Sequence, residues 1–150
     1  MTAEPPLLLD LEELALLLGL SAQDARRLND GGIFTGPSGL ECQLVVERPD
    51  SGSTACGRPL VKLGLKAYDL AGDEVHLFLT LQARLLANGQ WYLGASVKGD
   101  LQITSLQPFH NAHELAAAFD VANFTAWSTL QLMLEAMPLA EAGYPPEQMQ

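Results

Sequence analysis

The stretch from Asp73 to Trp127 constrains the fold of this chain more than any other part. It opens with an apolar segment, Val75 to Leu86, which runs into the turn sequence Ala87-Asn88-Gly89-Gln90. Two short runs in which apolar residues alternate follow, and then a long amphipathic segment. This order predicts strands followed by a helix. Because no nucleophile stands beside a base here and no residues have metal-ligand spacing, the stretch indicates a binding surface rather than a catalytic centre.

The segment from Val75 to Ala87 fits two structures. Every second residue from Val75 to Leu85 is apolar, which is the period of a strand. Leu77, Leu81 and Leu85 also recur at helical spacing, and the many Leu, Gln, Ala and Arg residues favour a helix. Period and composition disagree, so helix and strand both stay open for this segment.

The rest of the chain alternates short helices and strands. Asp10 is a candidate N-cap for a first helix that ends at Gly19, and a second short helix begins at Ser21. A last helix, capped by Asn111, extends to Leu134 or Met137. The expected strands are Ile33–Phe34, Leu40–Glu47, Leu60–Tyr68, Trp91–Val97 and Leu101–Leu106. Together they predict one α+β domain over residues 7–137, with tails at 1–6 and 138–150, and a loop from Pro49 to Gly57.

Composition and charge restrict the possible partners. With 48% hydrophobic and only 17% charged residues, the chain is expected to leave apolar surface for a subunit or a protein partner. The net charge is −10, and neither Lys nor Arg follows Lys98, so direct binding to nucleic acid or to an anionic membrane is not expected. No basic region precedes Leu7-Leu8-Leu9, and no apolar run reaches the about 18 residues of a membrane span. We therefore expect a cytoplasmic protein.

The residues that carry chemistry in other proteins are sparse here. Cys42 and Cys56 are expected to be reduced thiols, with a disulfide across a hairpin as the alternative. His110 and His113 have a spacing that metal sites use, but a structural site would need both cysteines and His76 to converge. Exposed histidines at a helix start are the simpler interpretation. We expect no metal, no cofactor and no enzymatic activity.

The segment from Leu11 to Phe34 has the sequence pattern of a helix-turn-helix motif. Its second helix carries Arg26 and Arg27, which such a motif would place at DNA. The same helix also carries Asp24 and Asp30, and the surrounding domain is acidic, so few basic residues remain to contact phosphates. A helical hairpin packed on a sheet is the simpler interpretation, and a transcription regulator stays as an alternative.

The order of elements is similar to that of the type III secretion effector chaperones of the Tir chaperone (CesT-like) family and of the YbjN-like proteins that share their fold. Residues 7–20 resemble the opening helix of that family. Residues 81–94 resemble its dimer helix, glycine turn and following strand, and residues 101–134 its last strand and closing helix. The resemblance implies an antiparallel sheet flanked by helices, in the order helix–strands–helix–strands–helix, with residues 75–87 helical. Residues 20–59 match poorly, with an extra helix and a long loop.

A second resemblance, to the export chaperone SecB, competes with the first. It is carried by residues 60–103, 123–136 and 143–146. In that case residues 75–85 form a strand. SecB lacks the N-terminal helix expected here, and this chain stops before the final helix of SecB.

Both resemblances imply a chaperone or adaptor without enzymatic activity. The first implies a homodimer that holds an extended or partly unfolded segment of a client protein, in secretion or, if YbjN-like, beside a stress or repair protein. Apolar pockets and strand addition at a sheet edge would hold the client, and the acidic surface favours clients with basic segments. The residues expected to line the groove are Leu11, Leu14, Leu18, Ile33, Phe34 and Val45. Those expected at the dimer interface are Phe78, Leu81, Leu85, Trp91 and Leu93.

Overall fold

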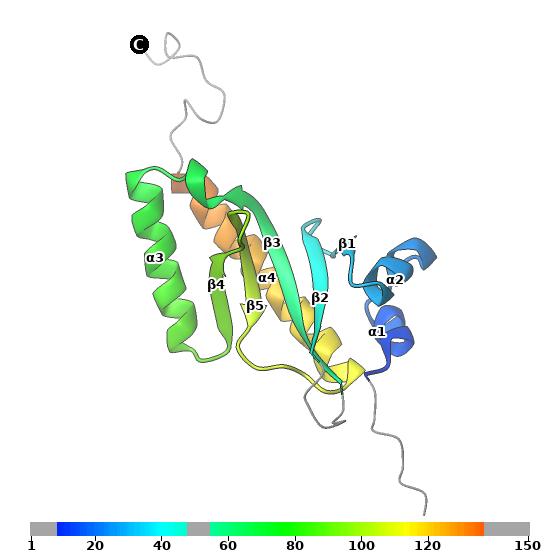
Figure 1. The fold of residues 1–150 in the computed structure, drawn as a ribbon. Coiled ribbons are helices and arrows are strands. Elements are labelled where there is room, and N and C mark those ends of the chain that lie inside the picture. The colour runs from blue at the N-terminus through cyan, green and yellow to red at the C-terminus, as the bar shows by residue number, and fades with distance from the viewer. Residues whose placement is uncertain (1–8, 48–54, 137–150) are drawn as a thin grey trace, which may run out of the picture.

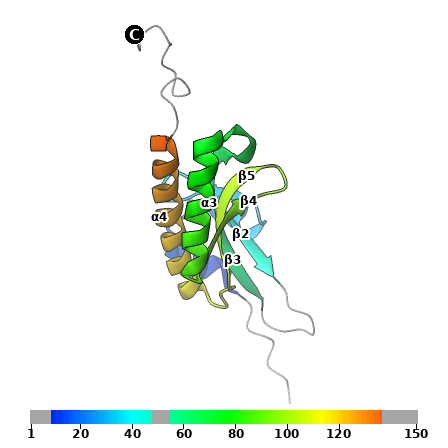
Figure 2. The ribbon, with the colours of Figure 1, turned by 90° about the vertical axis from the view of Figure 1, so that its left-hand side faces the viewer.

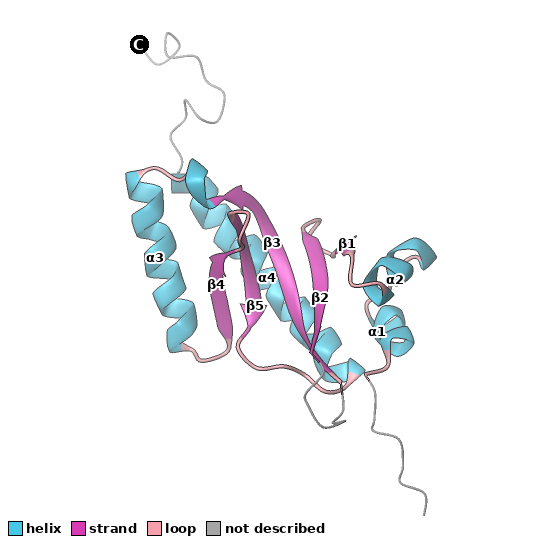
Figure 3. Ribbon diagram, viewed as in Figure 1, coloured by secondary structure: helices cyan, strands magenta, loops and turns pink. Residues whose placement is uncertain are grey.

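The computed structural model describes residues 9–47 and 55–136. Its elements are, in chain order, α1 (Leu11–Leu17), α2 (Ala22–Asn29), β1 (Ile33–Thr35), β2 (Glu41–Glu47), β3 (Cys56–Lys66), the short 3-10 helix η1 (Ala67–Asp69), α3 (Gly72–Ala87), β4 (Trp91–Ala95), β5 (Asp100–Ser105) and α4 (Ala112–Ala136) (Figures 1 and 3). The predicted tails, residues 1–6 and 138–150, and most of the predicted loop lie outside the described residues.

The five strands form one antiparallel sheet in the order β1-β2-β3-β5-β4. The predicted α+β class with an antiparallel sheet is therefore confirmed. Helix α4 crosses one face of the sheet and α3 packs beside α4 along the β4 edge, which leaves the opposite face of β2, β3 and β5 without a described helix (Figure 2). On β3 the alternation predicts the faces correctly, because Val61 and Leu63 point to the helical side and are buried.

The ambiguous segment is a helix, α3, so the strand implied by SecB is wrong for residues 75–85. Glu74 and Phe78 are buried on this helix, and Leu81 and Leu85 pack against the core at the following turns. Their spacing of four, three and four residues is that of one helical face. The side-chain carboxylate of Glu74 also accepts a hydrogen bond from the N–H of Ala71, 3.3 Å away, which satisfies a free donor at the helix start.

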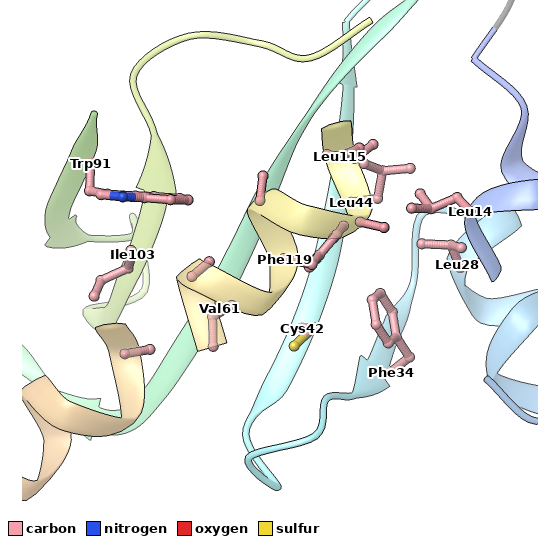
Figure 4. Packing of buried hydrophobic residues seen from close by; sticks show 14 of the residues in the cluster. Leu14, Leu28, Phe34, Cys42, Leu44, Val61, Trp91, Ile103, Leu115 and Phe119 are labelled. Atoms are coloured by element: carbon pink, nitrogen blue, oxygen red, sulfur yellow. The ribbon is translucent and has the colours of Figure 1, made fainter. Parts of the chain in front are cut away.

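Helix α4 crosses behind the sheet and supplies much of the core. Asn111 caps it, its side-chain oxygen accepting from the N–H of Glu114 at 2.8 Å. The buried side of the helix is rich in alanine, which lets the helix approach the sheet closely, while Leu115 and Phe119 fill the space between. The rings of Phe119 and Phe34 lie 5.6 Å apart and join α4 to β1 (Figure 4).

The N-terminal helices form as expected from their caps. The side chain of Asp10 accepts from the N–H of Glu13, and that of Ser21 from the N–H of Asp24. Helix α1 packs against α4, and α2 contacts β1 (Figure 1). The pair is thus a helical hairpin built into one end of the domain.

Several strand boundaries differ from the prediction, and the strand expected to reach Tyr68 ends at Lys66. Two of the differences have a cause in the hydrogen bonds. The strand expected from Leu60 starts at Cys56, because Gly57 exchanges backbone hydrogen bonds with Phe109 and stays within the sheet. The strand expected to reach Val97 ends at Ala95, because the hydroxyl of Ser96 accepts from the N–H of Asp100 and closes the turn earlier.

Candidate protein-binding site

The six residues predicted to line a groove do not lie on one surface. Leu14 is 0% exposed and belongs to the core, so placing it in a groove was wrong. Phe34 is 2% exposed and also belongs to the core, but part of it forms the wall of a hollow between the α1–α2 turn and Pro37. Both residues are buried because they anchor α1 and β1 onto α4. Leu11 and Leu18 are half-buried, whereas Ile33 and Val45 are exposed.

The second half of β2 is an open strand edge. Strand β1 pairs only with Glu41, Cys42 and Gln43, so Leu44–Glu47 has no strand neighbour on that side within the described residues. Val46 is 40% exposed there. An unpaired strand edge of this kind is a template for another extended chain.

A hollow of about 350 Å³ lies beside this open half of β2. Its lining residues are Leu9, Asp10, Leu11, Glu12, Asn29, Val46 and Ala55. The hollow therefore combines aliphatic side chains from the start of α1 with two carboxylates. Of the predicted groove residues only Leu11 is part of it. We name this hollow, together with Leu44–Glu47, the β2-edge groove.

Sequence reasoning missed Val46 and Leu9, which the structure places in this groove. Val45 was predicted instead, but its side chain points to the face of the sheet that no described helix covers. A strand period assigns residues to two faces without saying which face is covered. Two other predicted groove residues, Leu18 and Phe34, line a different hollow, between the α1–α2 turn and Pro37.

The opposite edge of the sheet is closed. Strand β4 has β5 on one side only, and α3 runs along its other side (Figure 1). The side-chain amide of Gln82 donates a hydrogen bond of 2.8 Å to the backbone carbonyl of Leu93. A helix side chain thus occupies an acceptor that another strand would need.

The predicted dimer residues are mostly inside the monomer. Phe78, Trp91 and Leu93 are buried in the core, so their assignment to a subunit interface was wrong. The reason is the orientation of α3, whose stripe containing Phe78 faces β4 and α4. Leu81 and Leu85, at the margin of this stripe, are half-buried.

The outward side of α3 carries a different apolar stripe. Val75, Leu79 and Leu86 are exposed, at spacings of four and seven residues. The sequence could have indicated this stripe, because these apolar residues do not belong to the helical face that contains Phe78. It was missed because the core face itself was taken for the interface.

The exposed face of the sheet is predominantly polar and cross-linked by ion pairs. Arg58 lies 2.7 Å from Glu47 and donates to the carbonyls of Ser105 and Leu106. Lys66 pairs with Asp100. The hydrogen bond between them lowers the pKa of Asp100 and raises the pKa of Lys66. Both side chains are partly open to solvent, which screens their attraction, so the pair adds little to stability.

The two cysteines are free and buried. Cys42 lies opposite Val61, and Cys56 is five residues from Val61 along β3, which at a rise of about 3.3 Å per residue separates the two positions by roughly 16 Å. A disulfide needs the two Cα atoms within about 7 Å, so the pair cannot be bridged in this fold. Burial raises the pKa of Cys42 to about 11, which leaves it a poor nucleophile.

No group of three or more His, Cys, Asp or Glu residues is arranged to hold a metal ion within residues 9–47 and 55–136. His113 instead lies 3.5 Å from the carboxylate of Glu13. In the same described part, no helix combines the length and the apolar character needed to cross a bilayer. Arg27, on the helix that a helix-turn-helix would present to DNA, pairs with Asp24 at 3.3 Å.

No family model, curated protein or solved structure matched this chain. What the protein binds therefore has to be inferred from its own surface.

Proposed function

We propose that this protein is a chaperone or adaptor without enzymatic activity that binds an extended segment of a partner protein and works as a homodimer. The observation that carries the proposal is the open half of β2 beside an apolar hollow. The opposite edge of the same sheet is closed by α3, so Leu44–Glu47 is the edge at which a partner strand can add.

The mode of binding follows from strand geometry. A segment lying along Leu44–Glu47 would form backbone hydrogen bonds with β2, and its side chains would alternate between the two faces of the sheet. One set would enter the hollow between Leu11 and Val46, and the other would lie over Val45. Asp10 and Glu12 at the rim favour a segment in which basic residues neighbour apolar ones.

The homodimer would form through the outward stripe of α3. Val75, Leu79 and Leu86 supply exposed apolar area there, and a specific interface needs about 800 Å² per subunit. Helix α3 lies beside β4, at the opposite end of the sheet from the β2-edge groove. A dimer of this kind would leave both grooves accessible.

The test uses two charge-introducing variants at exposed positions, Val46→Lys and Leu79→Lys. The probe is lysozyme whose disulfides have been reduced and alkylated with iodoacetamide, a basic chain that stays unfolded. We expect Val46→Lys to weaken capture of this probe about tenfold, because a charge then enters the apolar hollow, while the dimer persists in light scattering.

Leu79→Lys is the matched control, and it should yield monomers that still capture the probe. Equal capture by wild type and Val46→Lys would remove the β2-edge groove from the proposal. A wild-type protein that is monomeric at micromolar concentration would remove the homodimer.

A further inference from the structure

The outer side of α4 carries two large aromatic residues that the core does not use. Phe124 is 69% exposed and Trp127 is 46% exposed. They line a hollow of about 280 Å³ that is formed between α4 and the turn from β1 to β2. Its lining residues are Pro37, Ser38, Asp120, Asn123, Phe124 and Trp127, and we name it the α4 notch. It lies apart from the β2-edge groove and shares no lining residue with it.

Buried hydrogen bonds hold the walls of the α4 notch together. Asn123 is buried, and its amide nitrogen donates to the carbonyl of Phe119 at 2.9 Å. Its oxygen accepts from the hydroxyl of Ser38 at 2.7 Å and from the thiol of Cys42 at 3.5 Å. The turn is thereby tied to α4.

The backbone of the turn also approaches Asn123 very closely. A Cβ atom at Gly36 would lie 2.4 Å from the side-chain oxygen of Asn123, so only glycine fits there. Pro37, the next residue, is consequently held beside the two aromatic rings. The notch is preorganised, which lowers the entropy cost of filling it.

The one charged residue among those that line the α4 notch is an acid, Asp120. Helix α4 contains Glu114, Asp120 and Glu135 and neither Lys nor Arg. Asp120 lines the notch and has no ion pair within the described residues. In the adjoining hollow, which shares Asp120 with the notch, Asp24 is already paired with Arg27.

We propose that the α4 notch binds an arginine or lysine side chain of a partner protein. The cation would lie against the rings of Phe124 and Trp127 and beside the carboxylate of Asp120, with an apolar neighbour against Pro37. Aromatic faces attract cations, and a carboxylate within reach strengthens that attraction. Because Asp120 has no ion pair within the described residues, its carboxylate favours a basic occupant. A second copy of this chain would bring carboxylates towards each other on a protein of net charge −10, which opposes association through this surface.

The experiment uses the smallest probe that carries the proposed chemistry. Acetyl-Leu-Arg-amide is compared with acetyl-Leu-citrulline-amide, which has the same shape without the charge. Both are too short to add to β2 as a strand. Binding is followed through the indole N–H resonance of Trp127 in the full-length protein. We expect saturable binding of the arginine probe, at least about fivefold tighter than the citrulline probe and weaker with added salt.

Paired variants locate the interaction. Asp120→Asn should reduce the preference for arginine about threefold or more, whereas Glu135→Gln, an exposed acid on the same helix, should leave it unchanged. Phe124→Ala should weaken binding, whereas Leu132→Ala, another exposed apolar residue of α4, should not. All four positions are exposed, so these variants are expected to fold.

Three results would overturn the proposal. One is an equal or absent response to the two probes. Another is an equal loss with Asp120→Asn and Glu135→Gln. The third is a Trp127 resonance that shifts with protein concentration alone, which would assign the notch to a second copy. The proposed peptide groove is judged separately, because Val46→Lys should weaken capture of unfolded lysozyme about tenfold without altering this titration.

Discussion

The two ends of the sheet differ in how their strand edges are covered. At the β4 end, α3 runs along the edge and the side chain of Gln82 bonds the carbonyl of Leu93. At the other end, β1 protects only the first three residues of β2, and Leu44–Glu47 has no strand neighbour within the described residues. This difference between the two edges underlies the proposal that an extended partner segment adds at Leu44–Glu47.

The largest expected effect comes from loosening the open end of the domain. Phe119→Ala removes the ring that contacts Phe34 and should lower the free energy of unfolding by about 3–5 kcal/mol. Phe124→Ala, on the exposed side of the same helix, should change it by less than about 0.5 kcal/mol. Urea denaturation followed by circular dichroism measures both. Equal losses of unfolding free energy in the two variants would mean that the contact between Phe119 and Phe34 does not stabilise this end of the domain.

The reactivity of the two cysteines compares the paired half of β2 with its open half. Cys42 lies in the paired half of β2, whereas Cys56 lies opposite Glu47 in the open half. We expect iodoacetamide at pH 8 to modify Cys56 first, because local opening starts at the unpaired edge. Mass spectrometry of digested protein gives the order. Faster modification of Cys42 would place the weaker end of the sheet elsewhere.

The buried thiol of Cys42 predicts that the stability of the protein depends on pH. Burial raises the pKa of Cys42 from 9.0 to about 11, so the unfolded chain loses this proton at a lower pH than the folded one. The stabilising contribution is complete below pH 9 and is lost as the pH rises towards 11. Urea midpoints at pH 8 and pH 10.5 should therefore differ less in Cys42→Ala than in wild type. An unchanged difference would contradict the assignment to Cys42.

The smallest effect tests the closed end. Gln82→Ala frees the carbonyl of Leu93 and should cost about 1 kcal/mol in unfolding free energy. Amide hydrogens of β4 should then exchange faster, and the protein should aggregate more readily, because a second strand edge has been opened. Gln90→Ala, an exposed glutamine in the following turn, is the control. If Gln82→Ala changes neither exchange nor aggregation, packing of α3 alone closes this edge.

Much of the fold was predictable because local sequence determines it. Caps at Asp10, Ser21 and Asn111 marked the helix starts, and alternation on β3 assigned its two faces correctly. The conformation of residues 72–87 was open because the apolar residues satisfy both periods. Contacts of Phe78 and Gln82 with β4 and its surroundings are present only in the helical form.

The candidate site was predictable only in part. Leu11 lines the β2-edge groove, whereas Leu14, Phe34, Phe78, Trp91 and Leu93 were placed on surfaces although they are buried. An apolar residue at the right period has the same appearance in sequence whether it faces the core or a partner. Only the way that α1, α3 and β1 pack separates the two cases.

By itself the sequence determined an acidic α+β domain, the order of its helices and strands apart from residues 75–87, and the absence of Lys and Arg beyond Lys98. Tertiary structure alone decided which edge of the sheet is closed, which apolar stripe of α3 faces outwards, and that Pro37 lies beside Trp127. Periodicity is a property of neighbouring residues along one element. Which face is covered depends on contacts between elements far apart in the chain, and no local pattern encodes those contacts.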